Sequence, residues 1–117
     1  MKRIIIVEDD PDIRDALDVI LGSTYNVAIY SGAAPLLEED YELPDLYIID
    51  KQLSGVSGLS LCEYLKGQED TMRIPVILLS ASPDIVKLAK SSGADDALEK
   101  PFKVNILRAM VRYYVDK

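Results

Sequence analysis

Residues 4–11 read IIIVEDDP, and in this stretch four β-branched residues run directly into three carboxylates and a proline. The four apolar residues do not alternate with polar ones, which is typical of a strand buried on both faces of a parallel sheet. Asp10 suits the cap of a helix that begins at Pro11, and apolar residues follow at helical spacing from Ile13 to Leu21. The stretch therefore predicts a buried strand that passes through a short turn into an amphipathic helix.

The same alternation of strand and helix continues along the chain. Unbroken apolar runs at 46–49 and 76–79 predict two more buried strands, whereas 25–30, in which Asn26 suggests an edge, and 97–99 predict weaker ones. The helices expected between and after these strands cover 31–40, the segment from Leu59 to Leu65, Ser82 to Gly93, and Val104 to Val115. Five strand–helix repeats predict an α/β fold, a three-layer sandwich with a parallel five-stranded sheet and helices on both faces.

Length and composition indicate one folded domain covering 1–117. With 49% apolar and 28% charged residues, the composition is that of an ordinary globular domain. No apolar run approaches the roughly 20 residues of a membrane helix, and the start of the chain lacks the pattern of a signal peptide. The single cysteine, Cys62, excludes an internal disulfide, fits a cytoplasmic location, and is expected in the core because of its helical spacing from Leu59 and Leu65.

Charge and missing residue types exclude several classes of function. Thirteen basic against 20 acidic residues give a formal net charge of −7, which argues against direct nucleic-acid binding by this domain. The chain has no histidine, so it cannot hold a histidine-containing catalytic triad, ligate zinc through histidine or carry phosphohistidine. The other polar residues are therefore the candidates for chemistry.

Polar side chains follow four of the five expected strands. Glu8 and Asp9 come after the first, Asp50 after 46–49, Ser80 after 76–79 and Lys100 after the last. Ligands of an open parallel sheet bind just beyond the carboxyl ends of its strands, so we expect these side chains to meet at one rim.

A cluster of three carboxylates at that rim needs a compensating change. A raised pKa, the Lys100 ammonium group and a divalent cation are the available forms of compensation. Mg²⁺ takes a few carboxylates and leaves positions for phosphate oxygens, and phosphoryl transfer needs a nucleophile, a cation and a positively charged clamp. The residue types at this rim therefore favour phosphoryl transfer.

Each of these residues also has an ordinary structural interpretation. The acidic triplet 8–10 is compatible with a solvated turn that caps a helix, Asp50 with a turn, and Ser80 with a hydroxyl bonded to nearby backbone. Lys100 and Pro101 alone would mark the start of a loop. The functional interpretation depends on the whole set occurring together.

As an ordered set, these residues resemble the receiver domain of bacterial two-component response regulators over essentially all 117 residues. The resemblance is carried by Val7 to Pro11 with Arg14, Asp50 with Gly58, Ser80-Ala81, and Lys100-Pro101-Phe102. It implies a flavodoxin-like fold with strand order 2-1-3-4-5 and favours a cis peptide bond before Pro101. It also implies a phosphorylation-controlled signalling switch that acts only on its own phosphorylation and dephosphorylation, not a turnover enzyme.

The resemblance implies roles for the residues that would handle the phosphoryl group. Asp50 would accept it from a phosphohistidine on a partner histidine kinase or phosphotransfer protein. Lys100 would hold one phosphoryl oxygen, and Ser80 would donate a hydrogen bond to another. The lack of histidine fits this scheme, because the donor histidine belongs to the partner.

The same resemblance implies a cation site. Mg²⁺, or Mn²⁺ in its place, would be bound directly by Asp9 and Asp50. Glu8 would contribute through a water molecule, and Gln52 through its backbone carbonyl. The phosphoryl transfer would then depend on this cation.

Three positions depart from the family pattern in ways that matter. Ser54 stands where a proline is common and Ser57 where an aspartate is common, and we expect both to loosen the loop after Asp50 without affecting the chemistry. Ala97 stands where many receivers carry a tyrosine or phenylalanine that swings inward on activation. An alanine has no rotamer to switch, so we expect the signal to pass through backbone movement at 81–84 into the following helix.

Two other classes of function stay open. A phosphate-independent pseudo-receiver that binds proteins fits Ala97, although the retained site residues argue against it. A Mg²⁺-dependent phosphohydrolase with an aspartate nucleophile would carry a second aspartate where Gln52 stands, and this chain is too short for the cap such an enzyme needs.

The last helix carries an apolar stripe predicted to face the core, made of Val104, Leu107, Val111 and Val115. It also carries a second apolar stripe of Ile106, Met110 and Tyr113. The stripe fits half-buried packing, and it equally fits a homodimer or effector contact through the last two helices. We expect an output domain, where one exists, to attach beyond Lys117. A stand-alone regulator would have the same sequence up to that point.

Overall fold

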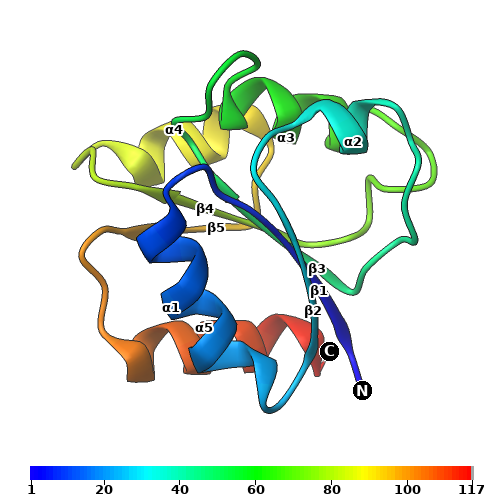
Figure 1. Ribbon diagram of the computed structural model, residues 1–117. Coiled ribbons are helices and arrows are strands. Elements are labelled where there is room, and N and C mark those ends of the chain that lie inside the picture. Colours follow the sequence, from blue (N-terminus) through cyan, green and yellow to red (C-terminus); the bar gives the residue numbers. More distant parts are fainter. Residues whose placement is uncertain (117) are drawn as a thin grey trace.

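The structure, a computed structural model, describes residues 1–116, which form five strands and five helices in strict alternation (Figure 1). The strands are β1 (Arg3–Val7), β2 (Asn26–Tyr30), β3 (Leu46–Asp50), β4 (Val76–Ser80) and β5 (Asp96–Glu99). The helices are α1 (Pro11–Gly22), α2 (Ala34–Leu37), α3 (Gly58–Lys66), α4 (Ile85–Ser92) and α5 (Val104–Val115). The predicted α/β fold is confirmed.

The strands form one parallel sheet in the order β2-β1-β3-β4-β5. Val7 is in register with Ile49, and Ser80 is in register with Glu99. Because the pairing is parallel and the registers match, the last residues of the strands lie along the same edge of the sheet. This edge is the rim at which the sequence predicts a site.

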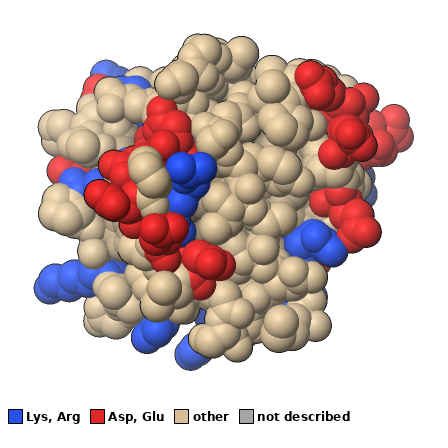
Figure 2. All heavy atoms as spheres, viewed as in Figure 1, with Lys and Arg blue, Asp and Glu red and all other residues tan. Residues whose placement is uncertain are grey.

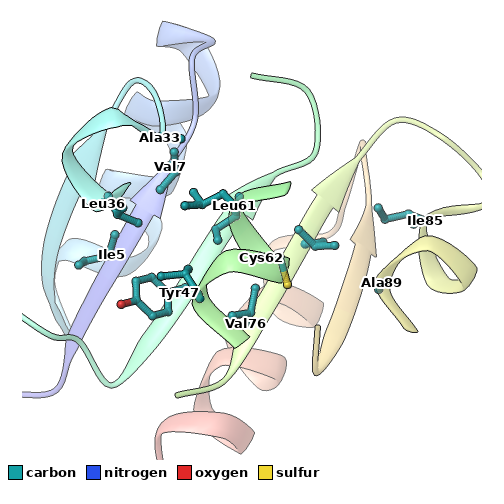
Figure 3. Close-up of a cluster of buried hydrophobic side chains, with 13 residues drawn as sticks. Ile5, Val7, Ala33, Leu36, Tyr47, Leu61, Cys62, Val76, Ile85 and Ala89 are labelled. Carbon is teal, nitrogen blue, oxygen red and sulfur yellow. The ribbon is translucent and has the colours of Figure 1, made fainter. Parts of the chain in front are cut away.

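Helices cover both faces of the sheet, as predicted. Helices α1 and α5 lie on one face, and α2, α3 and α4 lie on the other (Figure 1). On the second face, Leu36, Leu61 and Ile85 bring one side chain each from α2, α3 and α4 to the apolar cluster on the sheet (Figure 3). Cys62 is fully buried in the same cluster, which confirms its place in the core.

Burial separates central strands from edge strands. Every residue of β3 and β4 and all but the first of β1 are buried, whereas β2 and β5 are largely half-buried. The unbroken apolar runs of the sequence therefore belong to strands covered on both faces. The edge position predicted for the strand with Asn26 is confirmed.

The hydroxyls of Tyr47, labelled in Figure 3, and Tyr41 meet at the margin of this apolar cluster. Tyr47 of β3 is fully buried, and its hydroxyl lies 2.6 Å from that of Tyr41, which belongs to the segment between α2 and β3. The Tyr41 ring also packs edge-on against both Tyr47 and Tyr30. A buried phenol needs a hydrogen-bond partner, and this pair satisfies that need between two side chains.

The helix expected over 31–40 is much shorter than predicted, because α2 spans only Ala34–Leu37. Pro35 sits in its first turn, and Glu39 has a left-handed backbone with φ of 59°. The residues after Leu37 are acidic, and negative charge is unfavourable at the end of a helix. The remainder of 31–40 therefore forms bends and turns.

Helix α4 begins at Ile85 and not at Ser82 as expected. The Ser82 N–H donates to the Ser80 Oγ at 3.0 Å, and the Ser82 hydroxyl is hydrogen-bonded to Asp84. These bonds hold 82–84 in a turn and leave α4 without a side-chain cap.

Two residues predicted on apolar helix faces are exposed. Val104, the first residue of α5, is 41% exposed, and Ala16 of α1 also faces solvent. Leu17, Leu21, Leu107 and Val111 of the same stripes are fully buried against the sheet. The predicted stripes are therefore right in their centres and wrong at these two positions.

Candidate functional site

Four strands bring the predicted site residues together at the carboxyl rim. Glu8 follows β1, Asp50 and Ser80 are the last residues of β3 and β4, and Lys100 follows β5. Glu8, Asp50 and Ser80 are buried, whereas Lys100 is half-buried. The peptide bond between Lys100 and Pro101 is cis, as the resemblance suggested.

Lys100 is the hub of the site. Its Nζ lies 2.6 Å from Asp50 Oδ2 and 3.3 Å from Glu8 Oε1, so one ammonium group joins three segments of the chain. The Lys100 backbone N–H donates to the carbonyl of Ser80 at 2.8 Å, which fixes the start of the side chain beside β4. Charge-assisted bonds of this kind are short and strong when the groups are shielded from water.

Charge compensation at the rim takes the forms expected from the sequence. Burial raises the pKa of Glu8 from 4.5 to about 7, and the neighbouring Asp50 carboxylate adds to the rise. Burial by itself would lower the pKa of Lys100, but the hydrogen bonds and attraction from Asp50 and Glu8 raise it above its ordinary value. Lys100 therefore stays charged, and Glu8 can take up a proton near neutral pH.

The oxygens of Glu8, Asp9 and Asp50 lie within 4.8 Å of one another. One ammonium group faces these three carboxylates, so negative charge is in excess when all are ionised. Carboxylate oxygens are the ligands that Mg²⁺ and Mn²⁺ prefer in proteins. The donor set therefore fits a hard divalent cation.

The loop after β3 holds the second oxygen of Asp50. The Gln52 backbone N–H donates to Asp50 Oδ1 at 2.9 Å, so both carboxylate oxygens have a donor. The sequence assigned to Gln52 only a role for its carbonyl, and the role of its N–H was missed. Backbone N–H groups carry no side-chain signal, which explains the omission.

Gly58 owes its place to a close approach of two backbone segments. A Cβ atom at this position would lie 1.9 Å from the carbonyl oxygen of Asp50, well inside any allowed contact. The Gly58 N–H also donates to the carbonyl of Lys51 at 2.8 Å. Only glycine lets α3 begin this close to the residue that carries the candidate nucleophile.

The expectation that Ser54 and Ser57 loosen the loop after Asp50 stays a prediction, and each of these serines makes a hydrogen bond in the structure. The Ser57 hydroxyl caps α3 by accepting a bond from the Ser60 N–H at 3.1 Å. The Ser54 hydroxyl donates to Asp9 Oδ2 at 3.4 Å and so contacts a predicted cation ligand. The Ser57 cap is a local contact, and a serine directly before a helix is a sequence signal that could have found it. The contact between Ser54 and Asp9 joins two loops and leaves no local pattern in the sequence.

Ser80 is buried beside Lys100, and its Oγ accepts a bond from the Ser82 N–H at 3.0 Å. Acceptance of this bond leaves the hydroxyl hydrogen available for an acceptor at the rim.

Acidic side chains gather over the end of β1 and along α1, and a second group lies over the segment after α2 (Figure 2). The charge balance of the surface therefore agrees with the net charge of −7.

An apolar groove of about 560 Å³ adjoins the site. Ile13, Ala16 and Ile20 of α1 line one side, and Pro101 and Phe102 line the other. Lys100 also lines the groove, which connects the groove to the rim.

Within residues 1–116, no helix has the length and apolar character needed to cross a membrane.

Comparison with known proteins gives consistent matches over nearly the whole chain. Residues 4–112 match the family described as response regulator receiver domain. The DNA-binding response regulator MtrA of Mycolicibacterium smegmatis is 36% identical over 115 residues, which cover 95% of this chain and 49% of that protein. The DNA-binding dual master transcriptional regulator RpaA of Synechocystis is 37% identical over 117 residues, covering 96% of this chain and 48% of that protein.

A solved structure agrees with these matches. The crystal structure of the signal receiver domain of a signal transduction histidine kinase from Syntrophus aciditrophicus has a TM-score of 0.90 and 33% identity to this chain. The alignment covers 99% of this chain and 91% of that one. The chain spans about half the length of the curated relatives it matches.

Proposed function

Because this chain belongs to the family of response regulator receiver domains, we propose that Asp50 accepts the phosphoryl group by which its signalling switch is controlled. The observation that carries this proposal is the Asp50 carboxylate, buried at the rim with Lys100 Nζ at 2.6 Å from one oxygen. Glu8, Asp9 and Ser80 surround it on neighbouring strands and loops. A receiver domain is a signalling module and not a turnover enzyme.

The proposed transfer uses Asp50 as the nucleophile. An Asp50 oxygen forms a bond to phosphorus while the phosphorus–nitrogen bond of a phosphohistidine breaks, and the electron pair returns to the imidazole, which takes up a proton. Lys100, already bonded to the Asp50 carboxylate, is placed to move onto a phosphoryl oxygen. Ser80 is placed to donate its hydroxyl hydrogen to another oxygen, because its Oγ accepts the Ser82 N–H and keeps that hydrogen available.

Glu8, Asp9 and Asp50, with the carbonyl of Gln52, would hold Mg²⁺ or Mn²⁺ at this rim. When bound, the cation supplies positive charge that offsets the charge of the phosphoryl oxygens. The excess of carboxylates over ammonium groups in the site supports this assignment. The role of the Gln52 carbonyl rests on the family resemblance alone.

We further propose that the phosphoryl donor is a histidine kinase or phosphotransfer protein. The chain contains no histidine, so a phosphohistidine must come from another molecule. The apolar groove that Lys100 shares with α1 offers such a partner a surface beside the site. The net charge of −7 supports the view that this domain does not itself contact nucleic acid, and the single, buried cysteine is compatible with work in the cytoplasm.

The exposed stripe on α5 supports a second contact, to a homodimer partner or effector. Ile106 is 45% and Tyr113 59% exposed, while Met110 is half-buried and packs on the core. This surface lies away from the phosphoryl site, on the helix that follows Lys100. We propose that the signal reaches it through the segment after Ser80.

Incubation with acetyl phosphate and Mg²⁺, followed by intact mass measurement, tests the proposal. We expect the mass of one phosphoryl group on the unchanged chain and no gain for Asp50→Asn, because the amide cannot act as the nucleophile. Peptide mapping after borohydride trapping would locate the acyl phosphate. Modification of another residue, or a chain that binds Mg²⁺ without gaining phosphate, would favour the phosphate-independent pseudo-receiver instead.

A further inference from the structure

The three carboxylates of the site are not held equally. Glu8 and Asp50 are buried and share the Lys100 ammonium group, and each also accepts a backbone N–H. Asp9 is half-buried. Within residues 1–116, Asp9 accepts a side-chain hydrogen bond from Ser54, whose Oγ lies 3.4 Å from Asp9 Oδ2.

The loop that carries Ser54 is tied to Asp50 at its base. Gln52 donates its N–H to Asp50 Oδ1 at 2.9 Å, and the Gly58 N–H closes the loop on Lys51 at 2.8 Å. Gly55 turns the loop with a φ of 83°, directly after Ser54. The backbone that carries Ser54 is therefore tied to Asp50 on both sides, even though the residue itself is exposed.

We propose that Ser54 is a positioning residue that holds Asp9 toward the cation site and raises the affinity for Mg²⁺. This inference rests on the proposed function, in which Asp9 is a cation ligand. Without the cation, repulsion from Glu8 and Asp50 favours rotation of Asp9 toward solvent. The Ser54 hydroxyl opposes that rotation, and because a carboxylate has several lone pairs, the bond leaves Asp9 free to bind the cation.

The proposed contact needs a side-chain hydrogen-bond donor at position 54. A proline at position 54, which is common in the family that the chain resembles, has no side-chain donor. An alanine lacks the donor as well, whereas a threonine keeps it. The three residues thus separate the hydroxyl from other properties of the position.

Titration calorimetry with MgCl₂ on the whole chain tests the inference. We expect Ser54→Ala to raise the Kd for Mg²⁺ by roughly three- to tenfold, at or below the low end for outer-shell partners of a metal ligand because the bond is long and exposed. Ser54→Thr should keep the Kd close to that of the unchanged chain. The melting temperature of metal-free Ser54→Ala should not change.

Ser57→Ala is the matched control. Ser57 lies in the same loop, but its hydroxyl caps α3 and is hydrogen-bonded to the N–H and the hydroxyl of Ser60. We expect this variant to melt at a lower temperature and to bind Mg²⁺ with an unchanged Kd. Each serine should therefore affect one property only: Ser54 the affinity for Mg²⁺, and Ser57 the stability of the fold.

The outcomes separate this inference from the proposed function. An unchanged Kd in Ser54→Ala, with normal Mg²⁺ binding by the parent chain, would overturn the role of Ser54 and leave the cation site intact. A weakened Kd in both Ser54→Ala and Ser54→Thr would also overturn it, because the hydroxyl would not be the cause. Failure of the parent chain to bind Mg²⁺ would overturn the cation site and the inference together.

Discussion

Each end of the sheet holds a lysine that bridges distant segments, but the two lysines have different surroundings. At the amino end, Lys66 Nζ lies 2.7 Å from Asp95 Oδ2 and 2.8 Å from the carbonyl of Ile74. The same Asp95 oxygen accepts the Val76 N–H at 2.8 Å. There one ammonium group meets one carboxylate, and the remaining partners are neutral backbone groups.

At the carboxyl end, Lys100 meets Glu8 and Asp50, and Asp9 completes a cluster of three carboxylates. The lysine is outnumbered, and the pKa of Glu8 rises to about 7 through burial and the nearby Asp50. A lysine–carboxylate contact therefore does not by itself mark a functional site. The unbalanced charge at the carboxyl end is what distinguishes the site from a structural clamp.

Exchange of each lysine for alanine should give the largest difference between the two ends. Lys100→Ala should slow phosphorylation by acetyl phosphate about a hundredfold or more, because the clamp on the transferring oxygens is lost. Lys66→Ala should leave the rate almost unchanged and lower the free energy of unfolding by about 1–2 kcal/mol, since its hydrogen bonds to Asp95 and the backbone are lost. Mass gain with time and urea unfolding measure the two effects.

Circular dichroism of both variants should confirm that they are folded before the rates are compared. A slow Lys66→Ala, with normal folded structure, would contradict the division into a functional end and a structural end.

The stability of the protein should depend on pH through Glu8 at the carboxyl end of the sheet. The folded protein holds the Glu8 proton more tightly than the unfolded chain, so the stabilisation is fully present below about pH 4.5 and is lost as the pH rises through about 7. The shift corresponds to a change in unfolding free energy on the order of 3 kcal/mol for the metal-free protein. Urea unfolding between pH 4.5 and 8 measures it.

Glu8→Gln is the matched variant, because a neutral amide cannot titrate. The difference in stability between this variant and the parent chain should grow in favour of the variant as the pH rises. A difference that stays constant from pH 5 to pH 8 would show that Glu8 does not hold the raised pKa.

Mg²⁺ should stabilise the protein through the carboxylates at the carboxyl end of the sheet, and Lys66 and Asp95 at the amino end should not contribute to this gain. By mass action, a concentration one hundred times the Kd adds about 2.7 kcal/mol to the free energy of unfolding. Asp9→Ala should abolish this gain, whereas Asp95→Ala should be less stable but gain as much from Mg²⁺ as the parent chain does. If millimolar Mg²⁺ leaves the melting temperature of the parent chain unchanged, Glu8 and Asp9 do not bind the cation and form only a turn that caps α1.

The smallest expected effect concerns the route of the signal. Because Ala97 has no rotamer to switch, we expect beryllofluoride with Mg²⁺ to change amide exchange in the segment from Ser80 to Gly93, where Ser80 now accepts the Ser82 N–H. Exchange near Lys66 and Asp95 should not change, and Ser80→Ala should remove the effect. Changes confined to the loop after Asp50 would contradict this route.

The parts of the fold that were predictable are those governed by burial on two faces. The runs at 46–49 and 76–79 lie in β3 and β4, whose residues are all buried. Their short length, their aliphatic residues and the lack of polar alternation indicated strands covered on both faces. The meeting of Glu8, Asp50 and Lys100 was predictable for a related reason, because parallel strands end at the same rim. The catalytic and cation-binding roles of these residues stay predictions.

What could not be predicted depends on competition between contacts. Ser82 has the residue type of a helix cap, yet its N–H is bound to Ser80, and α4 starts later. Ser54 has no neighbour in sequence that signals its contact with Asp9, because that contact joins two loops separated by most of the first half of the chain. Local patterns describe preferences, and tertiary contacts decide among them.

Buried Tyr47, hydrogen-bonded to half-buried Tyr41, gives this protein an optical reporter of its own core. The chain contains seven tyrosines and no tryptophan, so its near-ultraviolet absorption comes mainly from phenol rings. Burial, and then the hydrogen bond with Tyr41, raise the pKa of Tyr47 far above its ordinary value. In an alkaline titration, phenolate absorbance from Tyr47 should therefore appear only when the core opens, so that unfolding can be followed by ultraviolet absorbance without any attached dye.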